Sequence, residues 1–235
     1  MTEPLFRTDA YLRETQAKVL FADERGIALD RTVFYAQGGG QPGDRGALIL
    51  ADGREILVVN ATYDADRKTI LHKAEGAELL QAGDSVTARI DWDLRFKRMR
   101  AHTALHLLSV VLPYPVTGGS VGDAEGRLDF DCESLFDKAD VEARLNALIA
   151  KNAAVTDRWI TDAELEANPG LVKTMSVKPP MGTGRVRIVS IEGLDLQPCG
   201  GTHVARTSEI GHATVTQIEK KGRLNRRVRI ALSEA

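Results

Sequence analysis

The chain of 235 residues has only two cysteines, Cys132 and Cys199, no marked excess of either charge and no long apolar run. One disulfide is formally possible, but so few cysteines, one of them near a histidine, favour a reducing compartment and metal binding. The 31 Lys and Arg residues nearly balance the 33 Asp and Glu residues. A basic field over the whole molecule is therefore excluded, and any contact with nucleic acid must rest on local patches.

Signals for membranes or secretion are also missing. No apolar stretch approaches the length of about 18 residues that a spanning helix needs, and residues 1–4 do not begin a signal peptide. We therefore expect a cytoplasmic protein without a membrane partner. The apolar fraction of 43% is enough for a sizeable core, and the length suits one large domain or two smaller ones.

The patterning of apolar residues changes near residue 90. Before it, short apolar stretches recur from residue 16 onward, with turn residues such as Asp52-Gly53 between them. This spacing predicts a small β-barrel-like domain over residues 1–90. After it, helical and strand patterns alternate, which predicts an α+β domain over residues 91–235 and an α+β fold class overall.

Caps and periodicity predict the elements of this second domain. The expected helices run from a cap at Asp93 to about Leu112, from a cap at Asp137 to about Asn152, and briefly from a capping box at residues 161–164. The expected strands cover residues 185–191, 212–218 and 225–232.

Four potential metal ligands form two pairs, each with the spacing i, i+4. His102 and His106 lie in a predicted helix, where this spacing puts both side chains on one face. Cys199 and His203 enclose two glycines, which favour a turn between them. Imidazole nitrogens and a thiolate sulfur are ligands that zinc prefers, and we predict that these four residues bind one zinc ion.

The role of such a zinc ion stays open at this point. The Glu of the HExxH motif is absent, which excludes a zinc protease of that type. A site with four protein ligands is usually structural, because catalytic zinc keeps a position for water or substrate. For catalysis, one ligand must leave the metal or the zinc must become five-coordinate.

Three consecutive glycines at residues 38–40 precede Gln41. Glycine adopts backbone conformations that other residues resist, and it allows a ligand to approach closely. The P-loop sequence is absent. The motif therefore predicts either a plain β-turn or a wall of a substrate pocket.

Basic residues cluster twice in the half of the chain that carries the metal ligands. Such clusters are usually solvated, but their position here fits a polyanion whose phosphates are held by Arg and Lys. The first cluster consists of Arg95, Lys97, Arg98 and Arg100. The predicted RNA contacts are Arg98, Lys220, Lys221, Arg223, Arg226 and Arg227.

These motifs together resemble the alanyl-tRNA editing proteins of the AlaX type, which are stand-alone relatives of the editing domain of alanyl-tRNA synthetase. The resemblance extends over nearly the whole chain, and the N-terminal glycine motif resembles the medium-length members. Residues 36–37 are Ala-Gln where the family often has Pro-Glu. The matching segments are residues 32–35, the glycine motif, His102-x-x-x-His106, residues 178–182, residues 199–203 and the last hairpin.

The resemblance implies an aminoacyl-tRNA deacylase, a hydrolase that protects translation fidelity with the help of zinc and without a nucleotide cofactor. The implied partner is tRNA(Ala) mischarged with serine, with glycine as a second candidate. Thr32 matches the family's pocket threonine and is the candidate reader of the serine hydroxyl, and Gln41 is a second candidate. Two alternatives remain, editing of seryl-tRNA(Thr) and a non-catalytic RNA-binding module with structural zinc.

Overall fold

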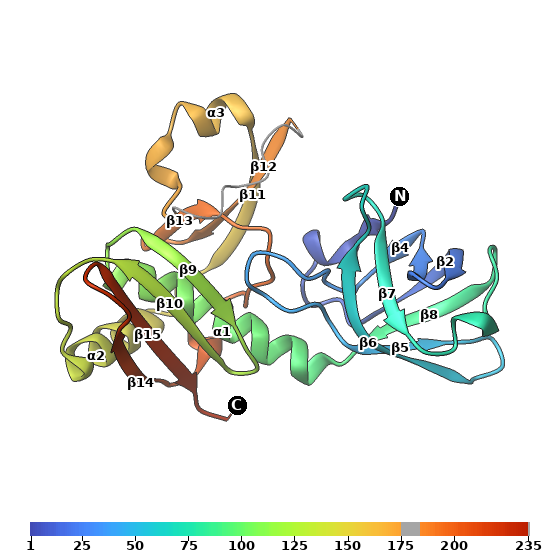
Figure 1. Ribbon diagram of the computed structural model, residues 1–235, viewed down its shortest axis with the longest axis horizontal. Helices are drawn as coiled ribbons and strands as arrows, with labels where there is room; N and C mark the ends of the chain where they lie inside the picture. The colour runs from blue at the N-terminus through green and yellow to red at the C-terminus, as the bar shows by residue number, and fades with distance from the viewer. Residues whose placement is uncertain (175–183, 235) are drawn as a thin grey trace. The chain divides into compact units, whose positions relative to one another are not determined.

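The computed structural model describes residues 1–174 and 184–234, so the matching segment at residues 178–182 lies outside the described residues (Figure 1). The chain forms two compact units, Met1–Phe96 and Lys97–Ala235. The predicted α+β class with an N-terminal barrel-like sheet is confirmed.

The first unit is built on a closed barrel with the strand order β2-β3-β7-β6-β5-β8, in which every neighbouring pair is antiparallel (Figure 1). Along β6, Ile56 and Val58 are buried whereas Leu57 and Val59 are exposed, as the two-residue period of a strand requires. The six strands are β2 (Glu14–Asp23), β3 (Gly26–Leu29), β5 (Gly46–Ile49), β6 (Glu55–Tyr63), β7 (Ile70–Ala74) and β8 (Ser85–Ile90).

Short elements complete this unit. The strands β1 (Glu3–Pro4) and β4 (Arg31–Thr32) pair in parallel. Gly43, just after the glycine motif, packs so closely on β6 that a Cβ atom there would lie 2.1 Å from the carbonyl oxygen of Ala61. The two 3-10 turns of the unit are η1 (Leu5–Arg7) and η2 (Ala77–Leu79).

Helix α1 (Trp92–Val111) begins two residues earlier than a cap at Asp93 implies. The backbone N–H of Leu94 donates to Oδ1 of Asp91 at 3.1 Å. Asp91, and not Asp93, therefore caps the helix, because its carboxylate reaches the free N–H groups of the first turn. The predicted cap at Asp93 is wrong.

In the second unit, a four-stranded antiparallel sheet has the order β14-β15-β10-β9. Helix α1 packs against it: a Cβ atom at Gly126 of β10 would lie 2.9 Å from the side chain of Leu105. The buried Val228 and Ile230 alternate along β15 with half-buried arginines, as the two-residue period of a strand requires. The strands are β9 (Val116–Val121), β10 (Glu125–Asp131), β14 (Ala213–Lys220) and β15 (Asn225–Leu232).

Two helices of this unit confirm their predicted caps. The carboxylate of Asp137 accepts from the N–H of Asp140 at the start of α2 (Lys138–Ile149). Thr161 and Glu164 form the predicted capping box of α3 (Asp162–Glu166). Within the described residues, no helix is long and apolar enough to cross a bilayer.

A smaller antiparallel sheet with the order β11-β12-β13 completes the second unit and leads directly into the second pair of predicted metal ligands. Its strands are β11 (Val155–Thr161), β12 (Arg185–Ile191) and β13 (Asp195–Pro198), and the remaining 3-10 turns are η3 (Pro169–Leu171) and η4 (Thr207–Ile210).

Candidate metal centre

The four predicted metal ligands come together within the second unit. His102 and His106 lie one turn apart on α1, while Cys199 and His203 lie in the loop that follows β13. The Sγ atom of Cys199 is 3.5 Å from Nε2 of His102 and 3.3 Å from Nε2 of His203. One ligand atom from each of the four residues lies within 4.8 Å of all the others.

These distances fit a single metal ion. With zinc bonds of about 2.3 Å to sulfur and about 2.0–2.1 Å to nitrogen, a tetrahedral centre separates sulfur from nitrogen by roughly 3.6 Å. The three imidazoles are buried, with 6–7% of their surface exposed, and Cys199 is half-buried. The four residues therefore form a group that could hold a metal ion.

The loop that carries Cys199 is fixed by Arg187 of β12. The guanidinium of Arg187 donates to the carbonyl oxygens of Cys199, at 3.2 Å, and Gly201, at 2.9 Å. The N–H of Gly201 lies 3.4 Å from Sγ of Cys199 and donates toward it. As predicted, the segment between Cys199 and His203 is not helical. The loop thus holds the sulfur in place and offers it a hydrogen-bond donor.

The distal nitrogens of two ligand histidines have partners that sequence reasoning missed. Nδ1 of His106 lies 3.0 Å from Oδ2 of Asp195, and Nδ1 of His203 lies 3.2 Å from the hydroxyl of Thr103. Burial opposes the charge of Asp195, but hydrogen bonds from His106 and Lys173 hold its pKa below the usual range. No signal for this contact existed in the sequence, because a polar residue that alternates with an apolar one in a strand is usually exposed, whereas Asp195 and Gln197 are the buried residues of β13.

Mutual interactions shift the pKa values of the ligands. Burial disfavours the thiolate of Cys199, yet His102 and His203 hold its pKa well below the ordinary value. Burial also opposes charge on His106, but Asp195 and Cys199 raise its pKa to about 9. Burial, helped by His102, lowers the pKa of His203 to about 3. The thiolate of Cys199 and the neutral imidazole of His203 are forms that metals bind, whereas His106 has to lose a proton when a metal binds.

Thr32, the predicted reader of the serine hydroxyl, lies on β4 and is completely buried. Its hydroxyl is 2.8 Å from Nε2 of His72 and accepts from the N–H of Phe34 at 3.1 Å. Nδ1 of His72 faces the carbonyl oxygen of Ile27 at 2.8 Å. Because a carbonyl oxygen only accepts, Nδ1 carries the ring proton and Nε2 carries none. The Thr32 hydroxyl therefore donates to Nε2. His72, which shows no pattern in the sequence, thus orients this hydroxyl.

The glycine motif forms a tight turn. Gly39 and Gly40 both have positive φ, 56° and 80°, and the flanking Gly38 and Gln41 exchange backbone hydrogen bonds of 3.1 and 2.9 Å. Two central residues with positive φ favour glycine in such hairpin turns. Gln41, the second candidate reader, is 1% exposed. Its part in a substrate pocket stays a prediction.

The first basic cluster is mostly interior. Arg95 and Arg100 are 0% and 1% exposed, so the expectation of a basic surface at these two positions is wrong. Arg95 bonds to the carboxylate of Asp44, and Arg100 donates to backbone carbonyls. Arg98 is 3% exposed, with Nε 2.8 Å from Asp123. Its contact with RNA stays a prediction.

The last hairpin carries the other predicted RNA contacts. Lys220 is exposed at the end of β14. Lys221 pairs with Glu219, and Arg223 pairs with Glu133 across exposed surface. These pairs are exposed or half-exposed, so they compete only weakly with a phosphate group.

The two remaining predicted RNA contacts, Arg226 and Arg227, have structural partners. Arg226 is 3% exposed and donates to the carbonyl oxygens of Glu133 and Ser134. Arg227 places Nε 2.7 Å from Oδ1 of Asp129, and its second nitrogen contacts Oδ2 at 2.9 Å. Arg226 therefore ties β15 to the segment that follows β10, and Arg227 ties β15 to β10. Their contact with RNA stays a prediction.

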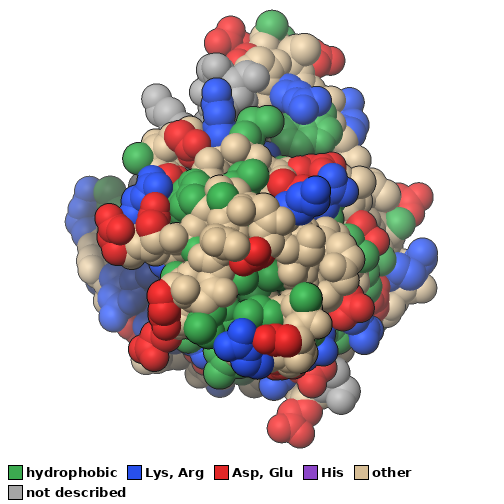
Figure 2. Space-filling model, turned by 90° about the vertical axis from the view of Figure 1, so that its right-hand side faces the viewer, with side chains coloured by type: hydrophobic (Ala, Val, Ile, Leu, Met, Phe, Trp, Pro, Cys, Tyr) green, Lys and Arg blue, Asp and Glu red, His purple; other side chains and the backbone are tan. Residues whose placement is uncertain are grey.

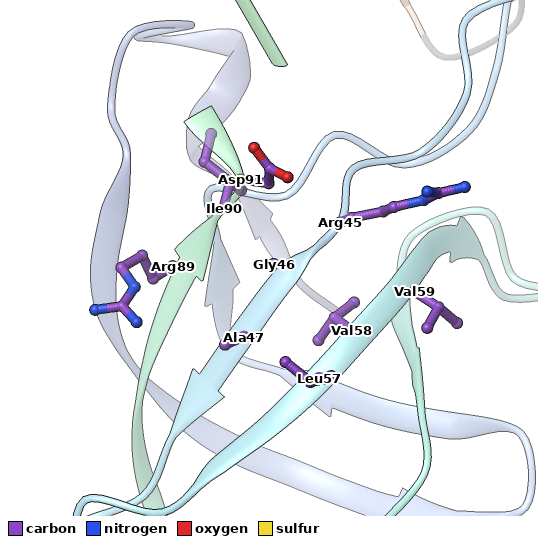
Figure 3. Close-up of a pocket in the computed structure, with 9 residues that line it drawn as sticks. All are labelled: Arg45, Gly46, Ala47, Leu57, Val58, Val59, Arg89, Ile90 and Asp91. Carbon is purple, nitrogen blue, oxygen red and sulfur yellow. The ribbon is translucent and has the colours of Figure 1, made fainter. Parts of the chain in front are cut away.

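The surface drawn in Figure 2 carries Lys and Arg side chains among Asp and Glu side chains, in keeping with the balanced composition. A pocket on the barrel is lined by β5, β6 and β8 and includes the exposed Leu57 and Val59 beside Arg45 and Arg89 (Figure 3). None of the predicted site residues lines this pocket.

Comparison with known proteins gives two family matches. Residues 8–94 match the model described as "tRNA synthetases class II (A)". Residues 186–229 match "Threonyl and Alanyl tRNA synthetase second additional domain". The two matched segments together cover most of the barrel unit and the part of the second unit that includes Cys199 and His203.

Several relatives match over nearly their full length. The alanyl-tRNA editing protein AlaX-M of Methanosarcina barkeri is 37% identical over 99% of both chains. The protein of the same name from Saccharolobus solfataricus is 33% identical over 97% of this chain and 98% of its own. Alanine–tRNA ligase of Pyrococcus furiosus is 35% identical over 93% of this chain, which corresponds to 24% of that enzyme.

Fold and site define an α+β protein in which a barrel unit precedes a unit with a three-histidine, one-cysteine group that could hold a metal ion. The near-full-length identity then decides the family. The chain belongs to the alanyl-tRNA editing proteins of the AlaX type.

Proposed function

We propose that this protein is a trans-editing deacylase that hydrolyses the ester bond of tRNA(Ala) mischarged with serine, with zinc as cofactor. The near-full-length relatives named alanyl-tRNA editing protein support tRNA(Ala) editing. The observation that carries the chemistry is the convergence of His102, His106, Cys199 and His203. Glycine is small enough to be accepted as well, which makes glycyl-tRNA(Ala) a second substrate.

A zinc ion bound by these four residues would assist ester hydrolysis in one of two ways. A zinc ion held there would polarise the ester carbonyl or lower the pKa of a bound water from about 15.7 to roughly 7. Cys199 contributes a thiolate, which Gly201 stabilises by donating an N–H toward the sulfur. His106 and His203 direct Nδ1 toward Asp195 and Thr103, which leaves Nε2 of each available as a ligand.

Discrimination between serine and alanine is assigned to Thr32. Its hydroxyl donates to His72 and accepts from the N–H of Phe34, which leaves one lone pair. Thr32 therefore acts on a substrate only as an acceptor, and a serine hydroxyl is a suitable donor. A buried group that requires such a partner can reject an analogue without it by roughly 10⁴-fold. Gln41 is the second candidate for this contact.

The nucleic acid is proposed to be held by Arg and Lys side chains of the last hairpin and by Arg98. Lys220 is exposed and has no ion pair among the described residues, whereas Lys221 and Arg223 are paired with Glu219 and Glu133. Arg226 and Arg227 stabilise this hairpin through their hydrogen bonds to Ser134 and Asp129.

One assay tests the substrate and the cofactor together. Deacylation is measured with tRNA(Ala) carrying serine, glycine or alanine and with seryl-tRNA(Thr), each with and without a zinc chelator. We expect rapid release of serine from tRNA(Ala), little release of alanine, and loss of activity on chelation that added zinc restores.

Other results would support the competing functions. The match to a domain of both threonyl and alanyl enzymes keeps seryl-tRNA(Thr) as an alternative substrate, and faster release from that tRNA would favour it. The use of four protein ligands favours structural zinc in a non-catalytic RNA-binding module. Binding of tRNA without any turnover would favour that module.

A further inference from the structure

Asp195 is buried beside the metal ligands and is surrounded by hydrogen-bond donors. Its side chain is 0% exposed. Oδ2 lies 3.0 Å from Nδ1 of His106 and 2.7 Å from the amide nitrogen of Gln197. Oδ1 accepts from the ammonium group of Lys173. The carboxylate is therefore compensated by a positive charge and satisfied on both oxygens.

The positions of these donors determine which ring nitrogen of His106 faces Asp195 with a proton. The amide nitrogen of Gln197 is also 3.0 Å from Nδ1 of His106, but an amide nitrogen only donates. Both groups point their hydrogens at Asp195, since its carboxylate is the acceptor they share. In the neutral form that binds a metal, His106 therefore keeps its proton on Nδ1 and presents the lone pair of Nε2.

His203 also has a partner at its distal nitrogen, but this hydrogen bond is weaker than the one between His106 and Asp195. Nδ1 of His203 lies 3.2 Å from the hydroxyl of Thr103, a neutral acceptor that itself donates to the carbonyl oxygen of Met99. A hydrogen bond to a carboxylate is shorter and roughly twice as strong as one between neutral groups. The carboxylate of Asp195 therefore makes His106 the more firmly oriented of these two ligands.

We propose that Asp195 is the positioning residue of the metal centre, which orients His106 and raises its strength as a ligand, while Lys173 compensates the buried carboxylate. The inference rests on the proposed metal site. A carboxylate bonded to the distal nitrogen of a ligand histidine fixes ring and tautomer, and its loss lowers metal affinity roughly 10–100-fold. Asp195 does not touch the substrate in this role.

Metal binding tests this role independently of catalysis. Zinc affinity is measured by competition with a chromogenic chelator for the full chain and for the Asp195→Ala and Asp195→Asn variants. Cobalt(II) is then bound in place of zinc, and its visible spectrum reports the ligand geometry. Asp140→Asn serves as the control, because Asp140 is a carboxylate on α2 that is 58% exposed and pairs, among the described residues, with Arg144.

We expect Asp195→Ala to weaken zinc binding by roughly 10–100-fold, Asp195→Asn to weaken it less, and both to shift the cobalt bands. The asparagine variant keeps the side-chain shape and guards against a simple failure to fold. Unchanged zinc affinity and an unchanged cobalt spectrum in both variants would overturn the proposal. Failure of the unaltered protein to bind zinc or cobalt would also overturn it, and with it the zinc dependence proposed above. Failure of tRNA hydrolysis alone would affect only the proposed function.

Discussion

The hydroxyl of Thr32 donates to Nε2 of His72 across 2.8 Å inside the barrel unit. The direction of this bond follows from the carbonyl oxygen of Ile27, which accepts the other ring N–H of His72. Thr32 consequently has no proton left for a substrate and offers only a lone pair. In the proposed recognition, the serine hydroxyl therefore donates the hydrogen bond and Thr32 accepts it.

Replacement of Thr32 by valine removes that lone pair with little change in shape. We expect the preference for Ser-tRNA(Ala) over Ala-tRNA(Ala) to fall by roughly 10²-fold or more, because the serine hydroxyl loses its partner. The variant also leaves Nε2 of His72 unpaired, at a cost of about 1–3 kcal/mol in stability. The ratio of kcat/KM values for the two substrates measures the effect. Thr32→Ser is the control, and an unchanged ratio in Thr32→Val would exclude Thr32 as the reader.

His72 predicts how stability depends on pH. Burial lowers its pKa from about 6.5 to about 4, against a weaker opposing effect of the hydrogen bond to Ile27. Between these two values the unfolded chain binds a proton that the folded protein does not, so the free energy of unfolding falls as the pH falls. The full effect is about 3 kcal/mol.

Urea unfolding at pH 7 and pH 4.5 measures this effect in wild type and in His72→Asn. We expect wild type to lose about 2–3 kcal/mol more than the variant over this interval. Other titrating groups are common to both proteins and cancel in the difference. Equal losses in the two proteins would show that His72 does not carry the effect.

Asp44 and Arg95 predict a large effect on stability. Both side chains are buried, 1% and 0% exposed, and Nε of Arg95 lies 2.9 Å from Oδ2 of Asp44. Asp44→Ala leaves a buried guanidinium uncompensated and should lower the free energy of unfolding by about 3–5 kcal/mol. The matched control is Asp52→Ala, since Asp52 pairs with Arg54 at the exposed surface and its loss should change stability by about 0–1 kcal/mol. Similar losses in the two variants, measured in urea, would contradict the role of the buried pair.

The pair of Asp44 and Arg95 shows which contacts could not be predicted from the sequence. The caps at Asp137 and Thr161 and the alternation along β15 were predictable because each depends on neighbours within a few positions. Arg95 stands in a basic run, and its partner Asp44 lies 51 positions away. A charged residue that is buried only through such a distant partner has the same local pattern as a solvated one.

The residues of the candidate site also fall into those that local sequence patterns could identify and those that they could not. Neither pair alone identified a metal site, but the two pairs together did, because their donor types suit one metal and helical spacing puts His102 and His106 on one face. Asp195 and His72 could not be assigned roles, because each acts through a residue far away in the chain, His106 and Thr32 respectively. Their hydrogen bonds follow from the fold and have no signature in local sequence.

Lys220 predicts a separate effect on tRNA binding. It is exposed at the end of β14, so Lys220→Ala should leave the fold intact. If Lys220 neutralises one phosphate, its loss should weaken binding of tRNA(Ala) and reduce the slope of log affinity against log salt by about 1. The control is Lys151→Ala, which removes an exposed lysine that follows α2. Identical slopes for wild type and Lys220→Ala would remove Lys220 from the interface.

The two cysteines allow the most direct test of a zinc-dependent deacylase. Cys132 and Cys199 are both free thiols, but only Cys199 belongs to the metal group. Zinc content and hydrolysis of Ser-tRNA(Ala) are measured on the same preparations of wild type, Cys199→Ala and Cys132→Ala. We expect wild type and Cys132→Ala to contain about one zinc ion per chain and to be active, whereas Cys199→Ala loses zinc and activity together. A zinc-free Cys199→Ala protein that still hydrolyses Ser-tRNA(Ala) at the wild-type rate would contradict the account.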